Sequence, residues 1–207
     1  GGPRPELIRN GADAWLRAAL EAFGLGQIIV APAIVALGFA GWSWLRRKDR
    51  PRGLLTVCSG MSLECLVFAV VLWGLSYGFA PFLNYLGVTL SAGAPPVDPI
   101  LSRVVTYVGA GIYEEILFRL VLFSGLAMLL RLALVPVYAA LPMAAIISAL
   151  VFAGAHHVGP HGERMDSYVF LFRTMAGLYF ALVYHLRGFG VAAGAHASYD
   201  VLVGLVP

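Results

Sequence analysis

Long apolar runs separated by short polar segments dominate the chain. The runs that are long enough to be membrane-spanning helices cover about 24–45, 54–80, 100–131, 142–157, 168–186 and 190–206. A membrane β-barrel would instead show short segments of alternating polarity. The pattern therefore predicts an all-α fold, a polytopic membrane helical bundle of about six transmembrane helices.

The segments outside these runs have different patterns. Residues 13–23 have the spacing of a short amphipathic helix that lies on the membrane surface. Residues 81–98 are interrupted by proline and glycine, which predicts a connecting loop, and 158–167 form a polar loop. The chain is therefore expected to divide into an N-terminal interfacial segment, 1–23, and one integral membrane domain, 24–207.

The composition agrees with a lipid environment. The 207 residues are 60% hydrophobic and 12% charged, whereas soluble domains carry roughly 25% charged residues. Basic residues cluster at 45–52, between the first two apolar runs, as is typical of a cytoplasmic loop. No basic face suited to nucleic acid is apparent. We expect a multi-pass protein of the cell membrane whose first span runs from the outside to the cytoplasm.

Ionisable residues inside the apolar runs point to function, because charge is costly in a bilayer. They are Glu64, Glu114, Glu115, Arg119, His156, His185, His196 and Asp200. We interpret Glu64 as structural, either protonated or paired with a residue of the pocket. His185 stands near a helix end and is interpreted as an interfacial residue.

Most of the remaining polar residues share one spacing. Three pairs stand four positions apart: Glu115 and Arg119, Phe152 and His156, and His196 and Asp200. Residues four apart lie on one face of a helix. Three helices thus each present a short polar or aromatic face, and the least costly arrangement turns all three faces onto one shared pocket.

The two adjacent glutamates are expected to differ. Glu115 lies one turn from Arg119, so the two charges can neutralise each other. Glu114 points about 100° around the helix and has no partner on it. An unpaired carboxylate in apolar surroundings is a stronger base than one paired with arginine. Glu114 is therefore the candidate general base.

Three motifs carry a family resemblance. "EEILFR" (114–119), "FAGAH" (152–156) and "HASYD" (196–200) occur in this order, each within an apolar run. The ordered triple resembles the CAAX-protease and bacteriocin-processing family of intramembrane glutamic endopeptidases. The resemblance covers about residues 100–204, which would form the catalytic core.

The resemblance implies a peptidase that needs no metal and no cofactor. By similarity, Glu114 activates a water with help from His156, and His196 and Asp200 stabilise the oxyanion of the tetrahedral intermediate. The expected partners are the bilayer and a protein or peptide substrate cut near the membrane surface. Prenylated CAAX proteins, bacteriocin leaders and C-terminal sorting tails all remain open as substrates.

Other residues would support this site. By similarity, Glu115 and Arg119 hold it together. We interpret Phe152 as a packing residue that shapes the pocket beside His156. Prenyl-protein proteases typically carry Asn at the last motif position, where this chain has Asp200. An aspartate donates a hydrogen bond only when protonated. An ionised Asp200 would instead orient His196 or pair with Arg119.

Alternative functions use the same residues. Glu and His side chains could bind zinc in a metalloprotease, although no His-Glu-x-x-His sequence is present. His157, His161 and Glu163 form a less favoured metal set in an open loop. A proton-coupled carrier or a membrane immunity module is a further alternative.

The positions of the two histidines also raise a question of depth. His156 stands at the end of its predicted helix and His196 near the start of its own. If every segment spans the bilayer, these helices run parallel and the histidines lie at different depths.

Overall fold

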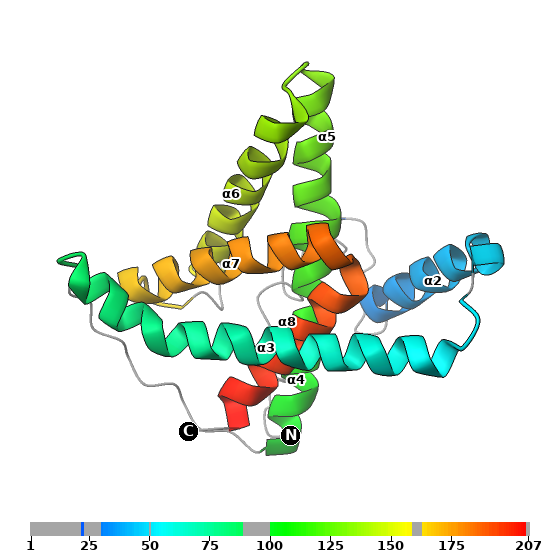
Figure 1. Cartoon of the computed structure of the whole chain (residues 1–207), viewed down its shortest axis with the longest axis horizontal. Coiled ribbons are helices and arrows are strands. Elements are labelled where there is room, and N and C mark those ends of the chain that lie inside the picture. The colour runs from blue at the N-terminus through cyan, green and yellow to red at the C-terminus, as the bar shows by residue number, and fades with distance from the viewer. Residues whose placement is uncertain (1–21, 23–29, 50, 89–99, 159–162, 206–207) are drawn as a thin grey trace.

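A computed structural model describes residues 22, 30–49, 51–88, 100–158 and 163–205. Over this part of the chain the fold is all-α, as predicted (Figure 1). The elements are α2 Val30–Leu45, η1 Arg47–Asp49, α3 Leu54–Tyr85, α4 Ile100–Glu115, η2 Ile116–Phe123, α5 Ser124–Leu132, α6 Val137–Ala155, α7 Ser167–Arg187 and α8 Phe189–Leu205.

Three of the described helices are long and apolar enough to cross a bilayer, namely α3, α6 and α7. Much of their apolar surface stays exposed, as lipid contact requires, for example Leu55 at 87% and Leu66 at 51%. These observations confirm the prediction of a membrane helical bundle. The predicted amphipathic helix at 13–23 lies outside the described residues, apart from Ala22 in a turn.

Two predicted helix boundaries were wrong, and both errors involve proline. The predicted loop at 81–98 begins too early, because α3 continues through Pro81 to Tyr85. The helix predicted to begin near Pro142 begins at Val137. Proline removes one backbone N–H, but the rest of the helical ladder can tolerate that loss within a packed membrane helix.

The predicted helix at 100–131 is one continuous helical segment from Ile100 to Leu132, made of α4, η2 and α5, and its middle part, η2, is a π-helix. π-helices are rare, and in this one two side-chain hydroxyls add hydrogen bonds to the backbone. The Ser124 hydroxyl donates to the Arg119 carbonyl (3.1 Å), and the Ser148 hydroxyl of α6 donates to the Phe118 carbonyl (2.8 Å). The π segment is thus held by side chains on both its own helical segment and its neighbour.

Small residues bring the helices around the centre very close together. A Cβ on Gly111 of α4 would stand 2.6 Å from the Ala197 backbone nitrogen of α8. A Cβ on Gly177 of α7 would stand 3.0 Å from Ala149 of α6. Close packing through small residues is characteristic of membrane helices, and here it allows side chains from α4, α6, α7 and α8 to meet.

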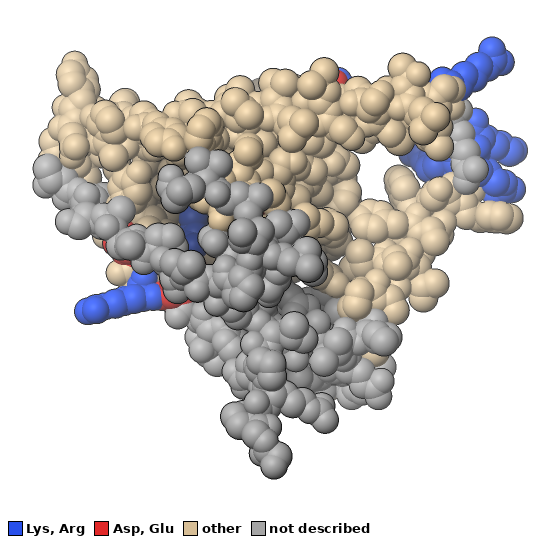
Figure 2. All heavy atoms as spheres, turned by 90° about the horizontal axis from the view of Figure 1, so that it is seen from below, with Lys and Arg blue, Asp and Glu red and all other residues tan. Residues whose placement is uncertain are grey.

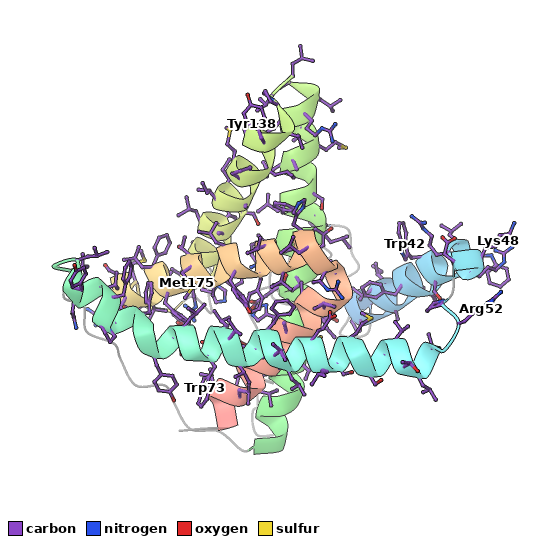
Figure 3. The ribbon with its side chains drawn as sticks, in the orientation of Figure 1. Trp42, Lys48, Arg52, Trp73, Tyr138 and Met175 are labelled. Carbon is purple, nitrogen blue, oxygen red and sulfur yellow. The ribbon has the colours of Figure 1, made fainter. Side chains whose placement is uncertain are left out.

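Basic side chains gather at the end of α2, at one edge of the molecule (Figures 2 and 3). Lys48 and Arg52 lie there, and the Arg46 guanidinium stands 5.4 Å from the Trp42 ring. Exposed tryptophan beside arginine and lysine is typical of a membrane interface.

The charge of Glu64 is balanced by a neighbouring helix. The Arg187 guanidinium at the end of α7 donates two hydrogen bonds to the Glu64 carboxylate, with Nε to Oε2 at 3.0 Å. Glu64 is therefore paired, but with Arg187 at the end of α7 and not with a residue of the pocket, as one of the two expectations had it.

Candidate active site

The three motifs lie on three separate helical segments. The two glutamates end α4 and Arg119 lies in η2, Phe152 is on the last turn of α6, and His196 and Asp200 are on α8. Figure 1 shows α8 beginning at about the level where α6 ends, so the two helices are offset along their length. This offset brings His156, just past the end of α6, and His196, in the middle of α8, to the same carboxylate.

Glu114 lies between the two histidines. Its Oε1 stands 3.7 Å from His156 Nε2, and its Oε2 stands 3.6 Å from His196 Nε2. The side chains are 6%, 19% and 5% exposed for Glu114, His156 and His196. Both contacts are longer than a hydrogen bond. The structure thus brings together Glu114, His156 and His196, three of the residues that the sequence predicts to be catalytic, with a small gap on each side of the carboxylate; the fourth, Asp200, is described below.

Glu115 contacts both His196 and Arg119 through its carboxylate. Its Oε1 accepts a hydrogen bond from His196 Nδ1 at 2.9 Å, and its Oε2 stands 3.2 Å from Arg119 Nε. The Glu115 and Arg119 side chains are fully buried. The predicted Glu115–Arg119 ion pair is present, and it additionally fixes His196. The two adjacent glutamates therefore contact opposite nitrogens of one imidazole ring.

Arg119 is held by its surroundings as well as by its ion pair. Its Nη2 donates to the Gly177 carbonyl of α7 at 3.2 Å. Its guanidinium carbon stands 4.6 Å from the centre of the Phe152 ring and 5.8 Å from that of Phe180. Aromatic faces attract a desolvated guanidinium. Phe152 thus does more than shape the pocket, because it also covers the buried cation.

The ring orientation of each histidine follows from its Nδ1 partner. His156 Nδ1 lies 2.8 Å from the Phe152 carbonyl, which only accepts, so Nδ1 carries the proton. His196 Nδ1 faces Glu115 in the same way. Each histidine therefore turns its Nε2 toward Glu114. The Phe180 ring stacks on His196 with centroids 4.3 Å apart, which fixes the plane of that ring.

Asp200 also faces His196. Its Oδ2 lies 3.6 Å from His196 Nε2, and its side chain is 22% exposed. The alternative pairing of Asp200 with Arg119 is not among the ion pairs of the described residues, where Arg119 pairs with Glu115. Asp200 therefore borders the same volume as Glu114 from the more open side.

Sequence reasoning missed the contribution of α7. Arg173, Gly177 and Phe180 stand at i, i+4 and i+7 on this helix, so they share one face. Gly177 and Phe180 contact Arg119 and His196, as described above. Gly177 and Phe180 also fit ordinary helix packing, so they carried no functional signal in the sequence. Arg173 did carry one, because it is an ionisable residue inside the run 168–186, and the sequence-based set of ionisable residues omitted it.

The metal interpretations have little structural basis in the described part of the chain. No group of three His, Cys, Asp or Glu side chains is arranged there to hold a metal ion. His157 Nδ1 lies 3.2 Å from the backbone carbonyl of Glu163, and the Glu163 carboxylate faces Arg173. His161 lies outside the described residues.

Comparison with known proteins places this site in a family. Residues 96–202 match the model of the Rce1-like family, described as type II CAAX prenyl endopeptidase, Rce1-like. The match spans slightly more than half of the 207-residue chain and includes all three motifs. The chain belongs to the Rce1-like family. A search of curated proteins found no match, and neither did a search of solved structures.

Membership in the Rce1-like family confirms the predicted resemblance. It makes the chain a CAAX-type membrane protease that acts on a peptide substrate at the membrane. The Rce1-like match begins just before α4 and ends within α8. α2 and α3 lie before the matched segment, although α3 packs against α8 inside it.

Proposed function

We propose that this chain is a glutamic-type intramembrane endopeptidase in which Glu114 activates the attacking water. The observation that carries the proposal is the position of the Glu114 carboxylate between His156 Nε2 and His196 Nε2, at 3.7 and 3.6 Å. Two polar atoms at this separation can both hydrogen-bond to one water placed about 2.8 Å from each. The gap between Glu114 and His156 therefore suits a nucleophilic water.

The geometry supports the following steps of peptide hydrolysis. Glu114 takes a proton from the water while the water oxygen bonds to the substrate carbonyl carbon, and the carbonyl oxygen becomes an oxyanion. His156 accepts a hydrogen bond from the water at Nε2 and orients it. Glu114 then passes the proton to the amide nitrogen, the C–N bond breaks, and the amine leaves.

His196 and Asp200 are assigned to the oxyanion. With Nδ1 bound to Glu115, a His196 ring that is also protonated at Nε2 presents an N–H toward the centre of the site. Asp200 borders the same Nε2 at 3.6 Å and, when protonated, supplies a second donor. Donors aimed at a developing oxyanion are among the largest contributions to acyl-transfer catalysis. Glu115 and Arg119 keep His196 in place.

We also propose a location and a domain organisation for the chain. The chain is a multi-pass protein of the cell membrane, with residues 24–207 as one domain and the catalytic core at about 100–204. The three helices able to span a bilayer and the basic end of α2 support this topology, with the 45–52 loop on the cytoplasmic side. The substrate then reaches Glu114 from within or beside the bilayer.

The test uses the full chain purified in lipid nanodiscs with three fluorogenic peptides. One ends in a prenylated CAAX sequence, one carries a bacteriocin leader, and one carries a C-terminal sorting tail. We expect cleavage of at least one peptide, identified by mass spectrometry, and no loss of activity with a zinc chelator. Failure to cut any of them, or activity that chelation abolishes and zinc restores, would contradict the proposal.

A further inference from the structure

α7 contains none of the three motifs. Residues on one face of it nevertheless contact residues of two motifs directly and a residue of the third motif through Glu163. The Gly177 carbonyl accepts from Arg119, and the Phe180 ring stacks on His196. Arg173, one turn before Gly177, donates two hydrogen bonds to Glu163, at 2.8 and 2.9 Å. Glu163 in turn bonds to His156 through its backbone. Gly177 and Phe180 thus contact site residues directly, whereas Arg173 is linked to His156 through Glu163.

His156 needs such support because it lies beyond the end of its helix. α6 ends at Ala155, and the His156 N–H reaches the Ala153 carbonyl at 3.4 Å, a long contact. Its own carbonyl accepts a short hydrogen bond, 2.8 Å, from the Glu163 N–H. This bond ties the backbone of His156 to the segment that leads into α7.

Glu163 is itself held from two sides. Its carboxylate meets the guanidinium of Arg173 in a bidentate pair, the geometry in which arginine binds carboxylates most strongly. Its carbonyl lies 3.2 Å from His157 Nδ1. The Arg173 side chain is 21% exposed and that of Glu163 is 56% exposed. Arg173 of α7 thus holds the Glu163 side chain, and the Glu163 N–H bonds to the His156 carbonyl.

We propose that Glu163 and Arg173 are positioning residues whose ion pair sets the place of His156 relative to Glu114. The inference rests on the proposed function, in which His156 orients the water. Both residues of the pair lie outside every motif. Without the pair, the segment that carries Glu163 is no longer held to α7, and the His156 backbone, which accepts a hydrogen bond from Glu163, loses that support; the His156 ring then drifts from the carboxylate that it faces.

The structure offers a matched control for this pair. Glu64 and Arg187 also form a bidentate carboxylate–guanidinium pair that joins another segment to α7. Neither contacts a residue of the candidate site by a hydrogen bond or ion pair in the described part of the chain. Loss of this control pair should affect stability without affecting the position of His156.

The first readout does not depend on activity. Diethyl pyrocarbonate modification of His156, followed by mass spectrometry of the full chain in nanodiscs, reports how well the ring is held. We expect Glu163→Gln to raise the modification rate of His156 roughly threefold or more over that of the wild type, and Glu64→Gln to leave it unchanged. Equal rates in the two variants would overturn the proposal.

The second readout is steady-state kinetics on the peptide that the wild type cleaves. Glu163→Gln should lower kcat by roughly 10- to 100-fold with little change in KM, because misplacement of a catalytic group by about 1 Å can cost about 100-fold. The exchange Glu163→Arg with Arg173→Glu restores a pair and should recover at least part of kcat. If Arg173→Glu alone lowers kcat and the exchange restores none of it, the charge of Arg173 matters and the pair does not. If no peptide is cut, the proposed function fails, while the modification rates still decide this inference.

Discussion

The Nδ1 of His196 lies 2.9 Å from the Oε1 of Glu115, although 81 positions separate the two residues. The same carboxylate holds Arg119 through its other oxygen at 3.2 Å. Glu115 is therefore shared between the buried cation of η2 and the imidazole of α8. Glu114, its neighbour in sequence, contacts the opposite nitrogen of the same ring. The pair of glutamates divides into one residue that holds the site and one that faces its centre.

Glu115→Gln should mainly destabilise the protein. The substitution leaves Arg119 buried without a counter-charge, and removal of one partner of a buried ion pair costs about 3–5 kcal/mol. Thermal unfolding in detergent, with Glu114→Gln as the matched variant, measures the difference. We expect a clearly lower melting temperature for Glu115→Gln than for Glu114→Gln. Equal melting temperatures would show that Arg119 does not depend on Glu115.

Substitutions at Asp200 distinguish a donor from an anion. If a protonated Asp200 donates to the oxyanion, Asp200→Asn keeps most activity and removes any loss at high pH. Asp200→Ala then loses roughly 100- to 1000-fold, the usual cost of one oxyanion donor. A pH–rate series on both variants is the measurement. Asn as damaging as Ala would show that the negative charge is what matters, for instance to orient His196.

Gly111→Ala tests the close approach of α4 and α8 beside the site. Its Cβ would stand 2.6 Å from the Ala197 nitrogen, next to His196, so the two helices must move apart. We expect a loss of stability of about 1–3 kcal/mol and a fall in kcat. Gly109→Ala is the control, because a Cβ there meets nothing within 4 Å and alanine favours a helix by up to about 1 kcal/mol. Similar behaviour of both variants would contradict the proposed packing.

The pH dependence of stability offers a test of the Glu163–Arg173 pair. Hydrogen bonds from Arg173 hold the pKa of the Glu163 carboxyl below its usual value of 4.5. A lowered pKa in the folded state means that the pair stabilises the fold above about pH 4.5 and that this contribution is lost as the pH falls through the lowered value. The melting temperatures of the wild type and Glu163→Gln should therefore differ near pH 7 and converge below pH 4.5. A difference that persists in acid would refute the role of the charge.

The sequence predicted those parts of the structure that depend on local pattern. The all-α fold follows from the long apolar runs, and the ionisable motif residues are conspicuous because charge is rare in such runs. The Glu115–Arg119 pair follows from helical spacing alone. Contacts within one helix can be predicted from the sequence, because residues three or four positions apart lie on the same face.

Other features depend on tertiary packing and were not predictable in this way. The pairing of Glu64 with Arg187 depends on how α3 lies against α7. The hydrogen bond from Ser148 of α6 to the Phe118 carbonyl of η2 depends on how α6 lies against that segment. Phe180 looks like any apolar residue until His196 is seen stacked on it. The depth of the two histidines was left open because it depends on the offset between α6 and α8.

The central claim is that Glu114 is the base, and the turnover of Glu114→Gln tests it most directly. This substitution keeps the shape and the surrounding contacts but removes the group that takes the proton from water. The measurement is kcat on the peptide that the wild type cleaves, with the melting temperature of the same preparation as a control for folding. The account predicts a protein that stays folded and has no detectable turnover. Substantial turnover by folded Glu114→Gln would contradict it.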